Sequence, residues 1–272
     1  MTFASIMVYT DGDKASDHRI RIARALADQF HAALIGVAAG APRPPMVAAH
    51  LIGTEIEAEI AAISAELAEK EKKFLKAACR SDGQTEWRGA HGMPNEAVAH
   101  EARAADLLVI GKEPSSSDPF LALDPGTVVL RTGRPVLAVP RSVQELKAKK
   151  VLIAWQDSRE ARRAVRDSLP FLAQADEILL TQVCEQNETE PARASVRDVA
   201  HYLSRHRIGA SAGIMLKAGG SVTDELLRVA AFENVDLIVC GAYGHSRLGE
   251  WVFGGVTRDL LDRSPVCCLF SH

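Results

Sequence analysis

The chain has 272 residues, and at about 150 residues per domain this length predicts one large domain or two small ones. A hydrophobic fraction of 47% and a charged fraction of 25% are ordinary for a globular chain and exclude disorder, collagen and coiled coil as the main architecture. The net charge of −3 leaves no basic excess for a nucleic-acid backbone or an anionic membrane, and 5% aromatic residues are too few for a base-stacking surface.

Strands and helices alternate along the first half of the chain. Apolar runs predict strands at residues 5–10, 32–38, 85–89, 105–110 and 135–139, and amphipathic runs predict helices at 14–30, 50–80 and 95–104. Runs that are apolar on both faces are typical of parallel strands with helices on both sides of the sheet.

The second half repeats this order. Strands are predicted at 151–155, 177–183, 211–216, 236–240 and 266–270, and helices at about 159–173, 190–206, 221–233 and 254–263. Asp157, Ser158 and Ser221 stand where helix N-caps are needed. With residues 141–150 as a polar linker, the sequence predicts an α/β fold of two tandem Rossmann-like, doubly wound domains, 1–140 and 150–272, each with a five-stranded parallel sheet.

Sequence similarity links the two halves directly. Residues Ala105–Gly111 and Val235–Gly241 have the sequences ADLLVIG and VDLIVCG at an offset of 130 residues, and Pro135–Val136 matches Pro265–Val266 at the same offset. The first strands match at an offset of 145, so the first half carries 15 more residues (145 − 130). We place these in the charged stretch 54–78, which we expect to form a long solvated helix.

The compartment is suggested by what the sequence lacks. No apolar run reaches the ~18 residues of a membrane-spanning helix, and the N-terminal residues have no basic signal-peptide region. The five cysteines show no Cys-x-x-Cys spacing and are expected to be buried free thiols. We therefore expect a cytoplasmic protein that has neither a membrane nor a nucleic acid as partner.

Glycines mark the loop that follows the fourth strand of the second half. Gly241 and Gly244 leave the strand, and Gly254 precedes the next helix. Glycine allows close backbone approach to a ligand, and a helix N-terminus offers unpaired N–H groups that suit phosphate. His245 and Ser246 add donors, and Thr257 adds a hydroxyl in the first helical turn. The alternative is that these glycines only permit a tight strand-to-helix turn.

The pattern Gly-x2-Gly-x9-Gly, followed by a helix and a Pro-Val strand, resembles the universal stress protein family, and because both halves resemble it, the chain looks like a tandem member. The resemblance implies sheets of strand order 3-2-1-4-5. It also implies, for many members, binding of ATP or a related adenine nucleotide, with no metal beyond nucleotide-associated Mg²⁺; other members bind none. Carried over by position, the implied nucleotide site comprises Ala154, Gln156, Val183, Gly241, Gly244, His245, Ser246, Gly254, Gly255, Val256 and Thr257.

Three positions depart from the family pattern, and one of them, Arg247, stands where the family often has glycine, so that a cation is added to the loop. Gly255 stands where the family has Ser or Thr, so a hydroxyl is lost while an N–H is kept, and Thr257 is placed to compensate. Gln156 stands where the first strand of the family ends in Asp. Its amide donates and accepts hydrogen bonds but supplies no carboxylate.

The first half has the complementary defect. It keeps the first-strand acid, Asp11, but Pro114, Asp124 and Pro125 replace Gly244, Gly254 and Gly255 at the 130-residue offset. Proline has no N–H, and a carboxylate repels phosphate. We therefore predict that this half does not bind ATP in the manner of the family and serves as a scaffold or pairing partner.

Other chemistry finds little support in the sequence. Among nine histidines, His201 and His206 are five residues apart and share no helical face well, and no His-Glu-x-x-His or Gly-x-Ser-x-Gly motif occurs. No general base is evident near the expected phosphates, so catalysis need not follow from binding, and slow ATP hydrolysis stays open as an alternative.

Three functions remain as hypotheses. The first is a stress-response protein that binds an adenine nucleotide in its C-terminal domain. The second is a nucleotide-free, chaperone-like interaction protein with both sites degenerate, and the third is an enzyme such as an adenylating enzyme, whose motifs are missing. The resemblance implies an intramolecular pseudo-dimer paired through strands 135–139 and 266–270, and it is compatible with a homodimer.

Overall fold

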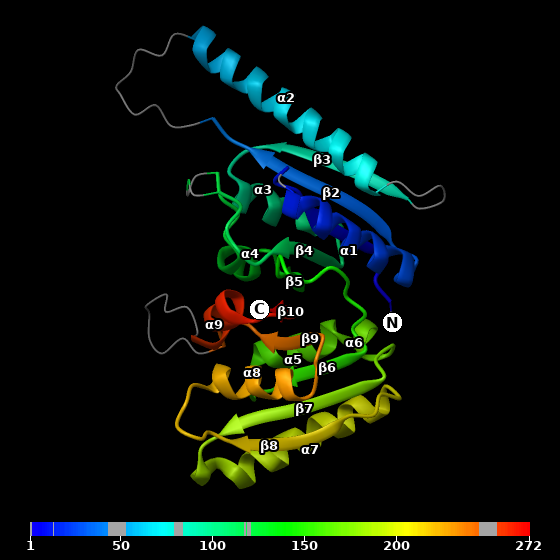
Figure 1. The fold of residues 1–272 in the computed structure, drawn as a ribbon, viewed down its shortest axis with the longest axis vertical. Coiled ribbons are helices and arrows are strands. Elements are labelled where there is room, and N and C mark those ends of the chain that lie inside the picture. The colour runs from blue at the N-terminus through cyan, green and yellow to red at the C-terminus, as the bar shows by residue number, and fades with distance from the viewer. Residues whose placement is uncertain are drawn as a thin grey trace. The chain divides into compact units, whose positions relative to one another are not determined.

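The computed structural model describes residues 2–12, 14–42, 53–78, 84–116, 118, 121–244 and 255–272 (Figure 1). By its internal contacts the chain divides into two units. One is Phe3–Arg134, and the other consists mainly of Pro135–His272.

The first unit is a parallel sheet with helices connecting its strands. Its elements are β1 (Ser5–Tyr9), α1 (Lys14–Phe30), β2 (Ala33–Gly40), α2 (Gly53–Ala78), β3 (Thr85–His91), α3 (Pro94–Glu101), the 3-10 turn η1 (Ala102–Ala104), β4 (Leu107–Gly111) and α4 (Pro125–Arg131). The strand order is β3-β2-β1-β4, and every pairing among these strands is parallel. Figure 1 shows the long helix α2 lying along β2 and β3.

The second unit has the same alternation. Its elements are β5 (Val136–Val139), β6 (Lys150–Ala154), α5 (Arg159–Asp167), α6 (Leu169–Leu172), β7 (Glu177–Cys184), η2 (Gln186–Glu188), α7 (Thr189–Arg205), β8 (Ser211–Leu216), α8 (Val222–Phe232), β9 (Leu237–Gly241), α9 (Gly255–Arg263) and β10 (Cys267–Ser271). Strands β6 to β10 lie in the order β10-β9-β6-β7-β8, all parallel, which confirms the expected 5-4-1-2-3 arrangement of the second half.

Among the described strands of the second unit, the pairing of β5 with β10 is the antiparallel one. Ala138 lies opposite Cys268, and Val136 lies opposite Phe270. The pairing of the two Pro-Val strands that the family resemblance implied is therefore present. The contact boundary falls at Arg134, so β5 is grouped with the second unit although its sequence repeat belongs to the first half.

One predicted helix is divided. Residues 159–173 form α5 and α6, because the helical hydrogen bonding is interrupted at Ser168, which ends α5 and precedes Leu169. Pro170 in the first turn of α6 has no N–H to donate to the turn before it, which is the physical reason for the break. The helix predicted at 95–104 likewise ends at Glu101 and continues as a 3-10 turn.

Buried strands form the core. β4, β9 and β10 are buried at nearly every position, as their continuous apolar sequences predict. Four cysteines, Cys184, Cys240, Cys267 and Cys268, are buried and free, which confirms the expectation for them; Cys79 lies outside the described residues. In the part of the chain that the structure describes, no helix is both long and apolar enough to span a membrane.

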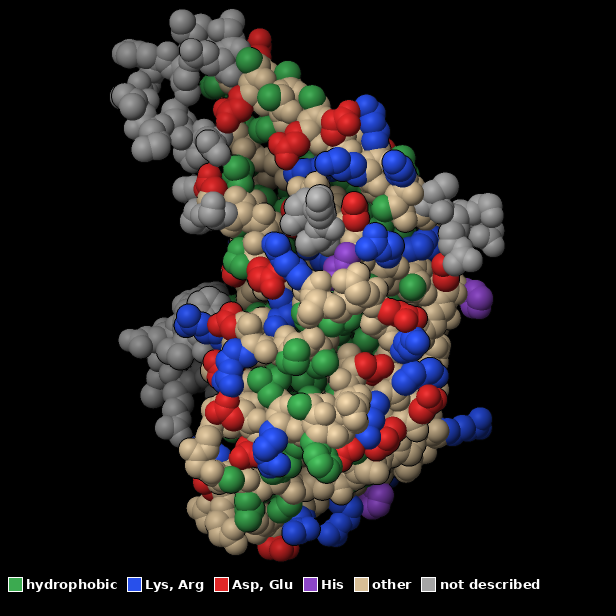
Figure 2. All heavy atoms as spheres, in the orientation of Figure 1, with side chains coloured by type: hydrophobic (Ala, Val, Ile, Leu, Met, Phe, Trp, Pro, Cys, Tyr) green, Lys and Arg blue, Asp and Glu red, His purple; other side chains and the backbone are tan. Residues whose placement is uncertain are grey.

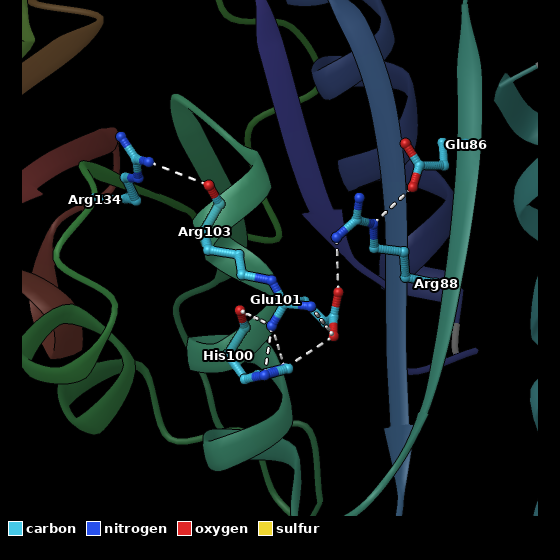
Figure 3. Close-up of polar contacts among 6 residues, drawn as sticks. All are labelled: Glu86, Arg88, His100, Glu101, Arg103 and Arg134. Carbon is cyan, nitrogen blue, oxygen red and sulfur yellow. Dashed lines mark hydrogen bonds and ion pairs between the residues drawn. The ribbon is translucent and has the colours of Figure 1, made fainter.

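Charged side chains are mostly paired with neighbours on the surface. On the face in Figure 2, acidic and basic side chains are interspersed rather than gathered by sign. Figure 3 shows one cluster of polar contacts in the first unit. Arg88 of β3 binds Glu86 at 2.7 Å and Glu101 of α3 at 2.8 Å. Arg134 donates a hydrogen bond to the carbonyl oxygen of Arg103. The ion pair between Arg88 and Glu101 holds α3 to β3, the edge strand of the first unit.

Candidate functional site

A cavity of about 390 Å³ opens at the carboxyl ends of β6, β7 and β9 in the second unit. In an open parallel sheet this edge is where ligands bind, at the point where the strand order reverses. The predicted site residues within the described chain all line the cavity: Ala154, Gln156, Val183, Gly241, Gly244, Gly255, Val256 and Thr257. The remaining predicted positions, His245, Ser246 and Gly254, lie outside the described residues.

The floor of the cavity is apolar. Ala154 of β6 is paired with Cys240 of β9 and with Thr181 of β7, and Val183 stands two residues beyond Thr181 on the same face. Val222 and Leu226 of α8 complete this apolar surface. A planar, weakly polar group would be stabilised here by removal of its surface from water.

The N-terminus of α9 forms a second wall. Gly255, Val256 and Thr257 are its first three residues and all line the cavity. Backbone N–H groups in the first helical turn have no acceptor within the helix, and the helix dipole places partial positive charge there. A Cβ at Gly255 would meet no described atom within 4 Å, so the backbone at this point is open to the cavity.

The two other helices that begin at the cavity are capped by their own side chains. In α5 the hydroxyl oxygen of Ser158 accepts a hydrogen bond from the N–H of Ala161 at 3.2 Å. In α8, Ser221 and Asp224 form a reciprocal capping box. Both predicted N-caps are therefore confirmed. The residue before α9 is a glycine in the sequence and has no side chain with which to cap it.

Gly241 allows α5 to approach β9 closely. A Cβ at this position would lie 2.4 Å from the backbone nitrogen of Ala161 and 2.7 Å from its Cα. Because these atoms are backbone, no side-chain rotation would relieve the overlap. Gly241 is therefore needed for packing of α5 on the strand, whether or not a ligand is bound.

The loop after β9 is held by a hydrogen bond to α9. Tyr243 has a left-handed backbone conformation, with φ of 60°, which is uncommon for a residue other than glycine. Its N–H donates to Oγ1 of Thr257 at 3.2 Å, and the Thr257 side chain is 2% exposed. The hydroxyl that we expected to serve the ligand therefore also positions the loop.

A buried carboxylate lies beside Gly244. A Cβ at Gly244 would be 2.9 Å from Oε2 of Glu160 and 3.0 Å from Oγ of Ser158, so these side chains touch the glycine. Burial of the Glu160 carboxyl opposes ionisation, but hydrogen bonds from its own backbone N–H, from Arg159 and from Ser158 outweigh it and lower the pKa of Glu160. The polar end of the cavity thus has an ionised acid next to it.

Cys240 in the cavity floor is not a reactive thiol. Burial, followed by the nearby Cys268, raises the pKa of the Cys240 thiol to about 12. At neutral pH the thiolate is scarcely populated, and the thiolate is the nucleophile. Within the described ranges, moreover, no group of three or more His, Cys, Asp or Glu side chains could hold a metal ion.

Several lining residues were not predicted: Trp155, Ser158, Ala161, Val222, Leu226, Cys240 and Tyr243. Trp155 and Cys240 adjoin predicted positions, so the strand ends were the available signal. Val222 and Leu226 are four residues apart on the face of α8 that packs toward the sheet, and no local pattern distinguishes them from ordinary core residues. Trp155 turns its indole toward α7, where its N–H donates to Oγ of Ser195 at 2.8 Å.

The corresponding position in the first unit is occupied by an internal ion pair. Asp11, which matches Gln156, binds Arg19 at 2.7 Å, and the two side chains are 10% and 5% exposed. Arg19 matches Ala164 at the same offset, and its Nη1 would lie 2.9 Å from a Cβ at Gly111. The Arg19 guanidinium therefore lies against Gly111, whereas the backbone of α5 lies against the matching Gly241 in the second unit.

The helix that follows β4 is capped by an acid. Asp124 accepts a hydrogen bond from the N–H of Thr127 at 2.7 Å, and Pro125 follows it at the first helical position. The side-chain carboxylate thus uses one of the amide donors that the second unit presents at the start of α9. This arrangement agrees with the physical basis for expecting no phosphate site here.

Comparison with known proteins places the chain in a class. Residues 147–271 match the model of the universal stress protein family. A universal stress protein from Archaeoglobus fulgidus DSM 4304 has the same fold with a TM-score of 0.70 and 15% identity, over 98% of this chain and 95% of that one. A protein of unknown function from Pseudomonas aeruginosa PAO1 gives a TM-score of 0.61 and 14% identity, over 99% and 92%. None of the curated proteins compared matches the sequence significantly.

The C-terminal part of the chain, residues 147–271, thus matches the universal stress protein family. Over nearly its full length the chain has the two-domain α/β fold of the A. fulgidus protein. A shorter family member solved in complex with cAMP is 26% identical, over 52% of this chain and 99% of that one, with a TM-score of 0.37.

Proposed function

We propose that the second unit binds an adenine nucleotide, ATP or a related one, in the cavity between β6, β9 and α9. The observation that carries this proposal is that eight positions implied by the family resemblance surround one cavity, which the N-terminus of α9 borders. In this proposal the base lies on the apolar floor of Ala154, Val183 and Cys240. The phosphate accepts hydrogen bonds from the N–H groups of Gly255 and Val256.

Gln156 serves the uncharged part of the nucleotide in this arrangement. Its side chain is exposed and lines the cavity, two residues after β6 ends at Ala154. A primary amide donates and accepts at once, which suits an adenine edge or a ribose hydroxyl. The role proposed for the chain is to hold a nucleotide in a stress response, and turnover is not part of the proposal.

Removal of a single N–H tests this function. Proline is tolerated at the first position of a helix, so Gly255→Pro deletes one donor with little cost to α9, while Gly255→Ala keeps the donor and is the matched control. We expect calorimetric titration with ATP and AMP to show binding by the wild type and the alanine variant. The proline variant should bind about 10-fold more weakly or worse, the loss expected for a hydrogen bond to a charged group.

Two results would contradict the proposal: no binding of any adenine nucleotide by the wild type, or equal affinity of the proline and alanine variants. Gly244→Pro is a second disruptive variant, because it introduces a ring against Ser158 and Glu160. Thermal melting of each variant without nucleotide separates loss of binding from loss of fold. Phosphate release measured over hours detects the alternative of slow hydrolysis.

A nucleotide-free interaction protein is the second candidate. Gln156 and Gly255 favour it, since the first removes a carboxylate and the second removes a hydroxyl from the family pattern. A native mass spectrum of the purified protein discriminates the two, because a bound nucleotide adds its mass to the intact chain. A bare chain that is also unresponsive to added nucleotide would support this second candidate.

We further propose that the first unit is a scaffold in an intramolecular pseudo-dimer and that the protein acts in the cytoplasm, alone or as a homodimer. The Asp11–Arg19 pair and the Asp124 cap support a first unit without nucleotide. Titration should therefore give about one nucleotide per chain. A stoichiometry of two would contradict this assignment. Light scattering of the eluted protein measures the oligomeric state.

A further inference from the structure

Glu160 is a buried acid at the polar end of the proposed phosphate site, where a negative charge opposes phosphate binding. It is the second residue of α5, and its side chain is 6% exposed. Its Oε2 lies 2.9 Å from where a Cβ of Gly244 would be, and Gly244 lines the cavity. This carboxylate oxygen therefore lies against Gly244, which is itself part of the cavity wall.

The partner of Glu160 lies on the solvent side. Arg159 binds the other oxygen, Oε1, at 2.8 Å through Nη2 and at 2.9 Å through Nε, but the Arg159 side chain is 75% exposed. Water and salt screen an exposed cation much more strongly than a buried anion. The pair is formally neutral, yet its field toward the cavity is dominated by the negative charge.

We propose that Glu160 is a specificity-determining residue that disfavours highly charged ligands, so that the site prefers a nucleoside monophosphate to a triphosphate. This inference rests on the proposed function and names the ligand class for the same cavity. A cavity of about 390 Å³ is on the order of one Debye length (~8 Å) across, so phosphates bound within it are not screened from Glu160 by bulk salt.

The described lining adds little to offset such repulsion. Its side chains are uncharged at neutral pH, so within the described residues the attraction for phosphate comes from backbone N–H groups and from the dipole of α9. A helix N-terminus carries roughly half an elementary charge. Each additional phosphate adds roughly one negative charge, and the balance therefore becomes less favourable from AMP to ADP to ATP.

The test is the ratio of dissociation constants, Kd(ATP)/Kd(AMP), measured by calorimetry in EDTA so that no divalent cation neutralises the phosphates. In the wild type we expect AMP to bind at least as tightly as ATP. Glu160→Gln keeps the shape of the side chain and one accepting oxygen, removes the negative charge, and should lower the ratio by roughly threefold or more. Arg159→Ala removes the cation that is paired with the Glu160 carboxylate and should raise the ratio.

Asp157→Asn is the matched control. It changes the net charge as Glu160→Gln does and lies three residues away, but its carboxylate is 55% exposed and is paired with Arg162. We expect it to leave the ratio unchanged. Thermal melting confirms that each variant is folded before its affinities are compared.

The possible results separate this inference from the function on which it rests. If the wild type binds no adenine nucleotide, the proposed function and the inference fail together. If it binds ATP more tightly than AMP, or if Glu160→Gln shifts the ratio no more than Asp157→Asn does, the inference alone is overturned and nucleotide binding stands. A ratio lowered by Glu160→Gln and raised by Arg159→Ala would support the inference.

Discussion

The N–H of Tyr243 donates a hydrogen bond to Oγ1 of Thr257 across 3.2 Å, and this contact joins the end of β9 to the first turn of α9. Tyr243 holds a left-handed backbone conformation, which for a tyrosine costs about 1–2 kcal/mol. The buried hydroxyl of Thr257 helps to maintain that conformation. Both residues line the cavity, so the geometry of the proposed site depends on this contact.

Thr257→Val should therefore destabilise the second unit by about 1–2 kcal/mol, because it removes the hydroxyl oxygen that accepts the hydrogen bond from the N–H of Tyr243. Thr257→Ser keeps the hydroxyl and should remain close to the wild type. Urea unfolding measures the free energies, and amide hydrogen exchange should be faster around Tyr243 in the valine variant alone. Equal stability and exchange in the two variants would show that the hydrogen bond has no such role.

Gly241→Ala should lower the free energy of unfolding by about 1–3 kcal/mol or more, since the added methyl group overlaps the backbone of Ala161 and forces α5 away from β9. Gly213→Ala is the control, because a Cβ there meets no described atom within 4 Å. Its effect should stay within about 0.5 kcal/mol. Chemical denaturation compares the two variants, and similar values for both would contradict the packing role of Gly241.

Arg19→Met should destabilise the first unit by about 3–5 kcal/mol, because it leaves the buried Asp11 carboxylate without its cation. The double variant with Asp11→Asn should recover part of the loss, as the uncompensated charge is then gone. Arg131→Met is the control, since its ion pair with Glu96 is exposed on both sides and spans 3.8 Å. An additive double variant would show that Asp11 and Arg19 are not coupled.

Asp224 gives the second unit a dependence on acid pH. The Arg263 guanidinium, with the backbone and hydroxyl of Ser221, lowers the pKa of Asp224 from 3.8 to about 2. A depressed pKa in the folded state stabilises the fold above about pH 3.8, and this contribution is lost as the pH falls toward 2. The stability difference between the wild type and Asp224→Asn should shrink over that range in urea titrations. A difference that is constant from pH 5 to 2 would contradict the assignment.

Most of the secondary structure was predictable because its signals are local. Apolar periodicity places the strands within one or two residues of their observed ends, and N-cap side chains such as Ser158 and Ser221 mark where helices begin. The division of residues 159–173 was missed, although Pro170 was the available signal. The parallel strand pairing within each half followed from the repeat, since similar sequences bury similar surfaces.

The site was predictable only where backbone chemistry requires a residue type. Glycine at 241, 244 and 255 pointed to close approach, and the structure brings these positions to one cavity. Glu160 gave no signal, because an acid in the first turn of a helix is ordinary and only the fold places it against Gly244.

By itself the sequence determined the repeated α/β order, the resemblance of the C-terminal half to a family, and the contrast between a glycine-rich loop and a proline-containing one, because these depend on residue type and spacing along the chain. Only the tertiary structure decided that Arg19 pairs with Asp11 beside Gly111 in the first unit, that Gly241 accommodates the backbone of α5, and that the buried Glu160 carboxylate lies against Gly244 of the cavity wall. Those are contacts between segments distant in sequence, and they exist only once the sheet brings the ends of its strands together.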